Sequence, residues 1–259
     1  MQKKGVVIFD FGSQYTQLIA RRVRELNVYS EVLSPDTNLD QIKRRDPSAI
    51  ILSGGPSSVF ADEAPNFDKR IFDIKIPILG ICYGLQLLAH HYGGLVESNS
   101  QGEYGLAEIE IDNNKKLFKN VSKRSQVWMS HMDRVTKIPD GWHTLAHSSN
   151  GVIAAMSNED QSIVATQFHP EVAHTDEGKI LIKNFLFKIA NSSPTWTAGN
   201  FIEEQIKLIR SQVKEDKVIV GVSGGVDSTV VAALLHKAIG NQSTAILIDH
   251  GLLRLNEAK

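Results

Sequence analysis

The only cysteine of the chain, Cys82, stands in the sequence Gly80-Ile81-Cys82-Tyr83-Gly84. A short apolar run precedes it and an apolar helical pattern follows it, which predicts a strand, a tight turn and a helix with the thiol at the turn. The two glycines permit a strained turn, and N–H groups at the helix start stabilise a thiolate and developing negative charge. An inert buried cysteine is the alternative. The pattern favours a nucleophile on a surface turn, outside the packed core.

A histidine and a carboxylate follow another apolar run. Residues 164–168 are typical of a strand, and His169-Pro170-Glu171 comes directly after them. A histidine at the end of a strand can act as general base toward a thiol, and a carboxylate two residues on can hold the other ring nitrogen and fix the tautomer. A structural histidine is the alternative when this motif is taken alone. Together with the cysteine turn, the motif predicts a catalytic triad of Cys82, His169 and Glu171.

A glycine pair follows the strand predicted at residues 49–52, in the sequence Ser53-Gly54-Gly55-Pro56. Glycine pairs mark turns in many proteins, so an ordinary turn is one interpretation. In folds with a nucleophile turn, a loop after a neighbouring strand also supplies the second N–H donor of an oxyanion hole. We therefore expect the N–H groups of Gly55 and Tyr83 to form the oxyanion hole.

A second glycine-containing loop lies further along the chain, again between a predicted strand and a predicted helix. Two glycines let the backbone close around phosphate oxygens, hydroxyl groups add donors, and the helix offers its positive end. The loop lacks the Gly-Lys-Ser/Thr ending of a Walker loop, so we expect it to bind pyrophosphate without a γ-phosphate lysine. Asp227 either holds Mg²⁺ or caps the helix. The residues expected to bind ATP are Ser223, Gly224, Gly225, Val226, Asp227 and Ser228.

These motifs need a framework that brings the ends of several strands together. Short β-branched apolar runs alternate with longer helical patterns, which is typical of a parallel sheet with crossover helices. Apolar runs without alternation fit strands that are buried on both faces. We expect an α/β fold whose mainly parallel sheet is flanked by helices. The expected strands are residues 6–9, 49–52, 78–81, 107–111 and 126–129, and the expected helices are residues 16–26, 85–92 and 180–187.

The sequence also predicts two domains, because Asn191-Ser192-Ser193-Pro194 supplies a helix stop and a linker. Beyond it, strand 218–222, helix 229–239 and strand 244–248 form the first β-α-β unit of a second α/β nucleotide-binding domain. Five apolar residues at helical spacing precede this unit and are expected to pack in its core: Phe201, Ile202, Ile206, Ile209 and Val213. One crossover is too little to bury a sheet, so we expect a truncated domain. The expected limits are 1–190 for the first domain, 191–200 for the linker and 201–259 for the second domain.

The composition excludes several classes of function. The chain has 28 Lys and Arg against 29 Asp and Glu, for a net charge of −1, so no bulk charge favours nucleic acid or an anionic membrane. Its apolar runs are far shorter than the roughly 20 residues that span a bilayer, and its start does not read as a signal peptide. We expect a soluble, cytoplasmic protein that binds no nucleic acid and no membrane. A single cysteine excludes an internal disulfide framework and a multi-cysteine metal cluster.

Taken together, the motifs resemble known families. The cysteine turn, His169-Pro170-Glu171 and the loop Ser53-Gly54-Gly55-Pro56 resemble the class I, or triad, glutamine amidotransferases. The loop at residues 223–228 resembles the pyrophosphate loop of the ATP pyrophosphatases. The order of these motifs, with the segments at residues 10–15 and 249–254, is similar to that in the glutamine-hydrolysing GMP synthases.

This resemblance implies that glutamine is hydrolysed through a γ-glutamyl thioester to supply ammonia, and that Gln86 and Asp133 hold glutamine. It also implies a ligase of purine biosynthesis, in which ATP and Mg²⁺ activate the C2 oxygen of xanthosine monophosphate (XMP) and ammonia displaces AMP to give GMP. Relatives of this family are expected to form homodimers through a C-terminal domain that this sequence does not include. The chain itself is therefore expected to carry out the glutaminase half-reaction only.

Two other functions fit the motifs. One is a non-catalytic glutamine-binding or regulatory module with the same fold, although such a module has no need for a cysteine, a histidine and a glutamate at these positions. The other is an enzyme of the γ-glutamyl hydrolase type, which would leave the loop at residues 223–228 without a role.

Overall fold

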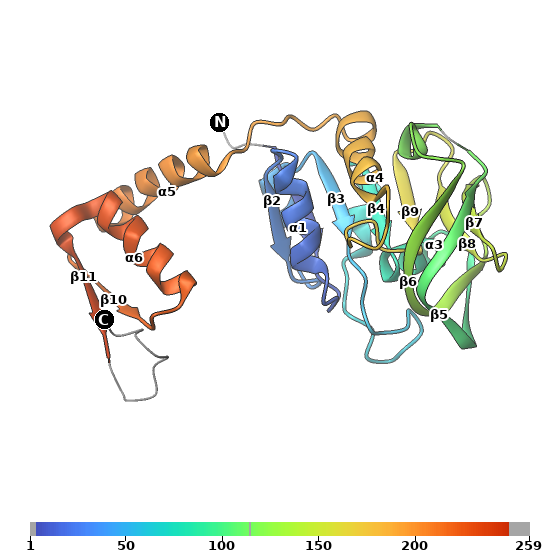
Figure 1. Ribbon diagram of the computed structural model, residues 1–259, viewed down its shortest axis with the longest axis horizontal. Helices are drawn as coiled ribbons and strands as arrows, with labels where there is room; N and C mark the ends of the chain where they lie inside the picture. Colours follow the sequence, from blue (N-terminus) through green and yellow to red (C-terminus); the bar gives the residue numbers. More distant parts are fainter. Residues whose placement is uncertain (1–3, 114, 249–259) are drawn as a thin grey trace. The chain divides into compact units, whose positions relative to one another are not determined.

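The computed structural model describes residues 4–113 and 115–248 and divides into two compact units, with the division between Thr195 and Trp196 (Figure 1). The segment at residues 249–254, which contributed to the resemblance, lies outside the described residues. Ser192 belongs to the first unit, because its Oγ lies 2.9 Å from Ser48 Oγ. The domain limits expected from the sequence stay a prediction.

A nine-stranded sheet forms the framework of the first unit, in the order β2-β1-β3-β4-β9-β8-β7-β5-β6 within the described ranges. Its first half is parallel. This half consists of β2 (Ser30–Leu33), β1 (Val6–Phe9), β3 (Ala49–Leu52), β4 (Ile78–Ile81) and β9 (Ile163–Thr166). The second half is antiparallel and consists of β8 (Ile153–Ser157), β7 (His143–Ser148), β5 (Leu95–Ile111) and β6 (Arg124–Lys137).

Helices cover both faces of the parallel half. Along β1, Val6 and Ile8 belong to one apolar core and Val7 and Phe9 to the other, because successive side chains of a strand point to opposite faces. The first core also contains residues of α1 (Thr16–Glu25) and α4 (Gly178–Asn184). The second contains residues of α2 (Leu39–Arg45) and α3 (Tyr83–His91). The expected α/β fold with a parallel sheet flanked by helices is therefore confirmed.

The antiparallel half extends further than the sequence predicted. The strand expected at residues 107–111 is the end of β5, and the strand expected at residues 126–129 is part of β6. Buried and exposed positions alternate along β6, so polar residues interrupt its apolar pattern. Strands β2, β7 and β8 were not predicted. Only strands that are buried on both faces gave a continuous apolar signal.

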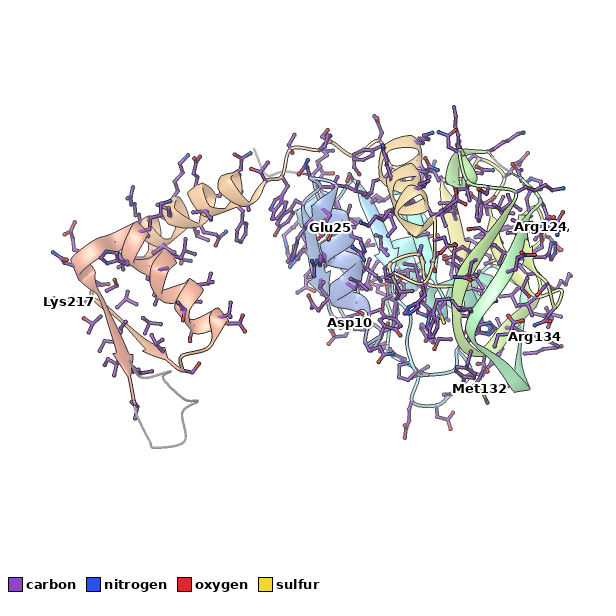
Figure 2. The ribbon with its side chains drawn as sticks, in the orientation of Figure 1. Asp10, Glu25, Arg124, Met132, Arg134 and Lys217 are labelled. Atoms are coloured by element: carbon purple, nitrogen blue, oxygen red, sulfur yellow. The ribbon has the colours of Figure 1, made fainter. Side chains whose placement is uncertain are left out.

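The parallel strands bring the predicted motifs to one edge of the sheet. Strands β1, β3, β4 and β9 are neighbours, and the loops that follow them all leave at their carboxyl ends, which is where ligands bind in parallel α/β sheets. After β1, Asp10 accepts hydrogen bonds from the N–H of Gly12 and the hydroxyl of Thr16. Figure 2 shows Asp10 near the first turn of α1 and Glu25 at its other end. Asp10 therefore anchors the first of these loops.

The second unit contains α5 (Ala198–Val213), β10 (Val218–Val222), α6 (Val226–Ile239) and β11 (Ser243–Leu247), with β10 and β11 parallel. The prediction that apolar residues of α5 lie in a packed core was wrong: the helix has no buried residue, and Phe201 is 37% exposed. Helix α5 packs against α6, where Arg210 Nε donates to the carbonyl of Ala238. Helix α6 alone covers only part of the apolar face of α5, so the residues of that face stay partly exposed. In the described part of the chain, no helix is both long and apolar enough to span a bilayer.

Candidate active site

Cys82 occupies a strained turn between β4 and α3. Its φ of 52° and ψ of −101° lie outside the regions favoured by non-glycine residues. The glycines on both sides make the turn feasible, since a Cβ on Gly84 would lie 2.6 Å from the carbonyl oxygen of Leu52 and one on Gly80 would lie 2.7 Å from Gly84. The expectation that Cys82 lies on a surface turn was wrong. It is only 4% exposed and belongs to the first apolar core, because β4 is central in the sheet.

His169 and Glu171 form a buried pair in the loop after β9. His169 Nδ1 lies 2.8 Å from Glu171 Oε1, and the two side chains are 4% and 0% exposed. The backbone holds both residues in place, because the N–H of His169 donates to the carbonyl of Trp128 and Arg22 Nε donates to the carbonyl of Glu171. The carboxylate therefore keeps Nδ1 protonated, and Nε2 is the ring nitrogen available for chemistry.

The charge state of His169 follows from its surroundings. Burial lowers its pKa, but the Glu171 carboxylate and Cys82 act in the opposite direction and together raise the pKa from 6.5 to about 10. The imidazole ring is therefore protonated at neutral pH.

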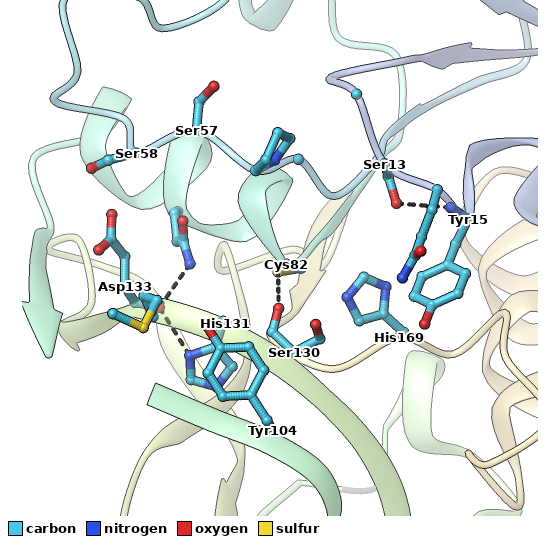
Figure 3. Close-up of a pocket in the computed structure, with 16 residues that line it drawn as sticks. Ser13, Tyr15, Ser57, Ser58, Cys82, Tyr104, Ser130, His131, Asp133 and His169 are labelled. Atoms are coloured by element: carbon cyan, nitrogen blue, oxygen red, sulfur yellow. Dashed lines mark hydrogen bonds between the residues drawn. The ribbon is translucent and has the colours of Figure 1, made fainter. Parts of the chain in front are cut away.

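Gly54 shows how closely Cys82 and His169 approach each other. A Cβ built on Gly54 would lie 3.0 Å from His169 Cε1 and 3.6 Å from Cys82 Cβ. The same position lies 3.5 Å from Ser13 Oγ, in the loop after β1. The segments that follow the four neighbouring strands β1, β3, β4 and β9 thus meet at one point, and Cys82 and His169 both line the pocket drawn in Figure 3.

We expect the substitution Gly54→Ala to lower kcat for glutamine hydrolysis by about 10- to 100-fold, because its methyl group would displace the His169 ring. The unfolding midpoint in urea is expected to change little, since the contact is with a side chain that can shift. Gly221→Ala is the matched control, because a Cβ there meets no atom within 4 Å. An unchanged kcat in Gly54→Ala would show that the position of the His169 ring does not affect glutamine hydrolysis.

The pocket has a volume of ≈ 590 Å³, within the range usual for small-molecule sites. It is lined by residues 12–15, 55–58 and 130–133, with Cys82, Gln86, Tyr104 and His169. In the part of the chain that the structure describes, no loop or turn hydrogen bond is donated by the N–H of Gly55 or of Tyr83. Gly55 lines the pocket. Tyr83 is buried against Phe11 and is not among the residues that line the pocket.

Gln86 and Asp133 meet on one side of the pocket. Gln86 Nε2 donates to the backbone carbonyl of Asp133 over 2.8 Å, so this amide group positions a neighbouring residue. The Asp133 carboxylate is buried, and its Oδ2 has no hydrogen-bond partner among the described residues. Asp133 itself is among the residues that line the pocket.

Three further residues contact the predicted triad. The Cys82 thiol donates to the carbonyl of Ser130 over 3.5 Å, and Gln167 Nε2 lies 3.7 Å from Cys82 Sγ. The ring of Tyr15 meets His169 edge-on, with centroids 5.2 Å apart. Local chemistry in the sequence assigned no role to any of these three residues. Gln167 follows the end of β9, where the chain bends.

The loop at residues 223–228 lies between β10 and α6, as predicted. Gly224 has a φ of +82°, and Ser228 Oγ accepts a hydrogen bond from the N–H of Ser223. Helix α6 is capped by Gly225 and not by Asp227, so the capping role considered for Asp227 was wrong. Asp227 lies exposed in the first turn of the helix. Among the described residues, no group of three or more His, Cys, Asp or Glu side chains could hold a metal.

Two protein-family models match the chain. The model described as glutamine amidotransferase class-I matches residues 7–189, and the model described as NAD synthase matches residues 199–252. Their order is the order of the two sets of motifs predicted from the sequence. The first match covers the parallel sheet, the cysteine turn and the buried His169–Glu171 pair.

Similar proteins agree with these matches. The GMP synthase [glutamine-hydrolyzing] of Brachyspira hyodysenteriae is 52% identical over 98% of this chain and 49% of its own length. That of Clostridium tetani is 50% identical over 99% of this chain and 50% of its own length. This chain thus spans about half the length of the curated relatives it matches. A crystal structure from Thermoplasma acidophilum, provisionally assigned as one of the subunits of a GMP synthase, is 29% identical, with a TM-score of 0.63 over 79% of this chain and 98% of its own.

A cysteine at a strained strand-to-helix turn, beside a buried histidine–carboxylate pair, is the arrangement of enzymes that act through a thiol nucleophile. The chain belongs to the class I glutamine amidotransferase family, since that model matches residues 7–189. The resemblance predicted from the sequence is therefore confirmed, including the similarity to glutamine-hydrolysing GMP synthases. The roles of the individual site residues stay predictions.

Proposed function

We propose that this chain hydrolyses glutamine to glutamate and ammonia, with Cys82 as nucleophile. The Cys82 thiolate attacks the side-chain amide carbon, and His169 gives a proton to the departing ammonia, leaving a γ-glutamyl thioester. A water molecule then loses a proton to His169 and attacks the thioester, which breaks the C–S bond, releases glutamate and restores the Cys82 thiolate beside protonated His169. Glu171 keeps the imidazole in the required orientation throughout. The observation that carries the proposal is the strained Cys82 turn beside the buried His169–Glu171 pair.

The walls of the pocket suit this substrate. In the proposal, the N–H groups of Gly55 and Tyr83 bind the oxyanion that forms when the thiolate attacks. The Asp133 carboxylate lines the pocket and accepts from the α-ammonium group of glutamine, and Gln86 keeps Asp133 in place. A charged contact at one end and a reactive thiol at the other select a side-chain amide at a fixed distance from an amino group.

We further propose that the ammonia serves GMP synthesis, in which ATP activates XMP. Relatives named GMP synthase over the whole of this chain support this step, as does the loop at residues 223–228. Its backbone would hold the pyrophosphate of ATP at the start of α6. Mg²⁺ is commonly bound by one or two carboxylates together with phosphates, so Asp227 fits as one ligand beside bound nucleotide. The homodimer and the cytoplasmic location expected from the sequence are proposals of the same kind.

Steady-state glutamate release tests the proposal. We expect the purified chain to release glutamate from glutamine without ATP or XMP, because every residue that lines the pocket lies in the first unit. Addition of ATP, Mg²⁺ and XMP is expected to yield no GMP, since in the described part of the second unit only Ala238 is buried and no enclosed nucleotide site is formed. Absence of glutamate under all conditions would contradict the proposed hydrolysis, and formation of GMP would contradict the second expectation.

The same assay separates the alternatives. A non-catalytic glutamine-binding module would bind glutamine without releasing glutamate. An enzyme of the γ-glutamyl hydrolase type would prefer γ-glutamyl peptides to glutamine. The match of residues 199–252 to a nucleotide-using family favours the amidotransferase over both.

A further inference from the structure

Glu103 and His131 form a second buried pair of titratable side chains beside the pocket. Glu103 lies on β5 and His131 on β6, opposite each other in the register of the two strands. His131 Nε2 lies 3.4 Å from Glu103 Oε2, and the side chains are 2% and 14% exposed. Neither the triad nor the predicted glutamine contacts include this pair.

The hydrogen bond on the far side of the ring fixes the His131 tautomer. His131 Nδ1 lies 3.0 Å from the backbone carbonyl of Asp133, and a carbonyl oxygen can only accept. Nδ1 therefore carries a proton. In the neutral imidazole, Nε2 then has a lone pair and no hydrogen, and it faces Glu103.

Hydrogen bonds to one of its two oxygens hold the Glu103 side chain in place. Its Oε1 accepts from Asn150 Nδ2 over 2.8 Å and from the hydroxyl of Ser148 over 3.3 Å. Its Oε2 and His131 Nε2 are both buried and have no hydrogen-bond partner among the described residues. Without a proton between them, two buried acceptors would face each other at 3.4 Å, which is strongly unfavourable.

We propose that Glu103 and His131 share one proton, and that this positioning pair holds Asp133 and Gln86 in the geometry that binds glutamine. The inference rests on the proposed function of the pocket. A continuous chain of hydrogen bonds supports it, because the Asp133 carbonyl accepts both from His131 Nδ1 and from Gln86 Nε2. Figure 3 shows the two bonds converging on Asp133. Loss of the shared proton would release His131 and, through it, the Asp133 backbone.

The surrounding charges indicate the direction of the pH dependence. Burial lowers the pKa of His131, Glu103 and the Asp133 carbonyl act against this, and His169 lowers the pKa further. The neutral imidazole is thereby favoured. Arg134 lines the same small cavity, of ≈ 260 Å³, and Figure 2 shows it near Met132. A pair that shares one proton loses it as the pH rises.

Glu103→Gln tests the inference, because the amide N–H of glutamine can replace the shared proton and does not titrate. We expect the wild-type KM for glutamine to rise about tenfold across the neutral range, below the pH at which the α-ammonium group of glutamine and His169 lose their protons, with kcat changing much less. Glu103→Gln is expected to keep the neutral-pH KM within about twofold and to abolish this rise. Glu103→Ala is expected to raise KM at every pH, since it leaves His131 Nε2 without a partner.

Glu108→Gln is the matched control, an exposed glutamate on the same strand, and it should keep the wild-type profile. A rise in KM over the same neutral range that persists in Glu103→Gln would overturn the inference. So would a wild-type KM that does not vary with pH.

A measurement without turnover separates this inference from the proposed function. Nitrogen-15 NMR of the histidine side chains should show His131 as the Nδ1–H tautomer with a hydrogen-bonded Nε2 whose shift changes with pH in the wild type and not in Glu103→Gln. If the chain releases no glutamate but His131 behaves in this way, the hydrolysis proposal fails and the proton-sharing pair stands. An Nε2–H tautomer of His131 would overturn the pair itself.

Discussion

Replacing Cys82 with alanine is expected to lower glutamate release by at least about 10³-fold, to the level of the uncatalysed reaction. Cys82 is the only thiol in the chain, so no other side chain can form the thioester. Its position in the strained turn between β4 and α3 places the sulfur beside His169 and at the floor of the pocket. The measurement is steady-state glutamate release at saturating glutamine.

The Cys82→Ala experiment needs a measurement of stability as its control. Cys82 is buried in the first apolar core, so its replacement by alanine also removes packing, at a cost of about 1 kcal/mol. Urea unfolding of both proteins should show this small loss and a transition that remains cooperative. Glutamate release at the wild-type rate by folded Cys82→Ala would refute the assignment of the nucleophile.

Glu171→Gln is expected to lower kcat by about 10²- to 10⁴-fold with little change in KM. The amide can present its oxygen or its nitrogen to His169 Nδ1, so it neither fixes the tautomer nor stabilises the imidazolium. Glu171 lies outside the pocket, which leaves the glutamine contacts intact. Glu159→Gln, at an exposed position, is the matched control. A large rise in KM with unchanged kcat would instead assign Glu171 to substrate binding.

We also expect Glu171→Gln to change how the unfolding free energy depends on pH. The raised pKa of His169, about 10, means that its ion pair with Glu171 contributes stability below pH 6.5 and that this contribution is lost as the pH rises toward 10. In Glu171→Gln the carboxylate is gone while burial remains, so the pKa of His169 should fall. The difference in unfolding free energy between the two proteins should therefore shrink from pH 6 to pH 10. An equal difference at both pH values would contradict the raised pKa.

The sequence predicted the parts of the site that local patterns specify. Cys82 stands between two glycines and His169 stands two residues from Glu171, so each motif could be read from a few adjacent residues. Four of the parallel strands, β1, β3, β4 and β9, could be predicted because nearly all of their residues are buried. That Cys82 itself is buried could not, because this depends on the central place of β4 in the sheet.

Contacts between distant strands could not be predicted. Glu103 meets His131 only because β5 and β6 pair in one register, and a register shift between Ser98 and Glu103 separates this pairing from a simple hairpin pattern. For α5, the apolar spacing correctly predicted a helix, but the prediction that its apolar residues are buried in a core was wrong. Periodicity indicates which residues share a face and does not show how much of that face is covered.

Trapping of the thioester tests the central claim most directly. The chain is mixed with glutamine, quenched in acid within the first turnovers and digested, and the peptide that contains Cys82 is analysed by mass spectrometry. The account predicts a γ-glutamyl adduct on Cys82 that forms before steady-state release and grows when Glu171→Gln slows hydrolysis of the thioester more than its formation. Glutamate release at the normal rate, with no adduct on Cys82 at any time in the wild type or in Glu171→Gln, would contradict it.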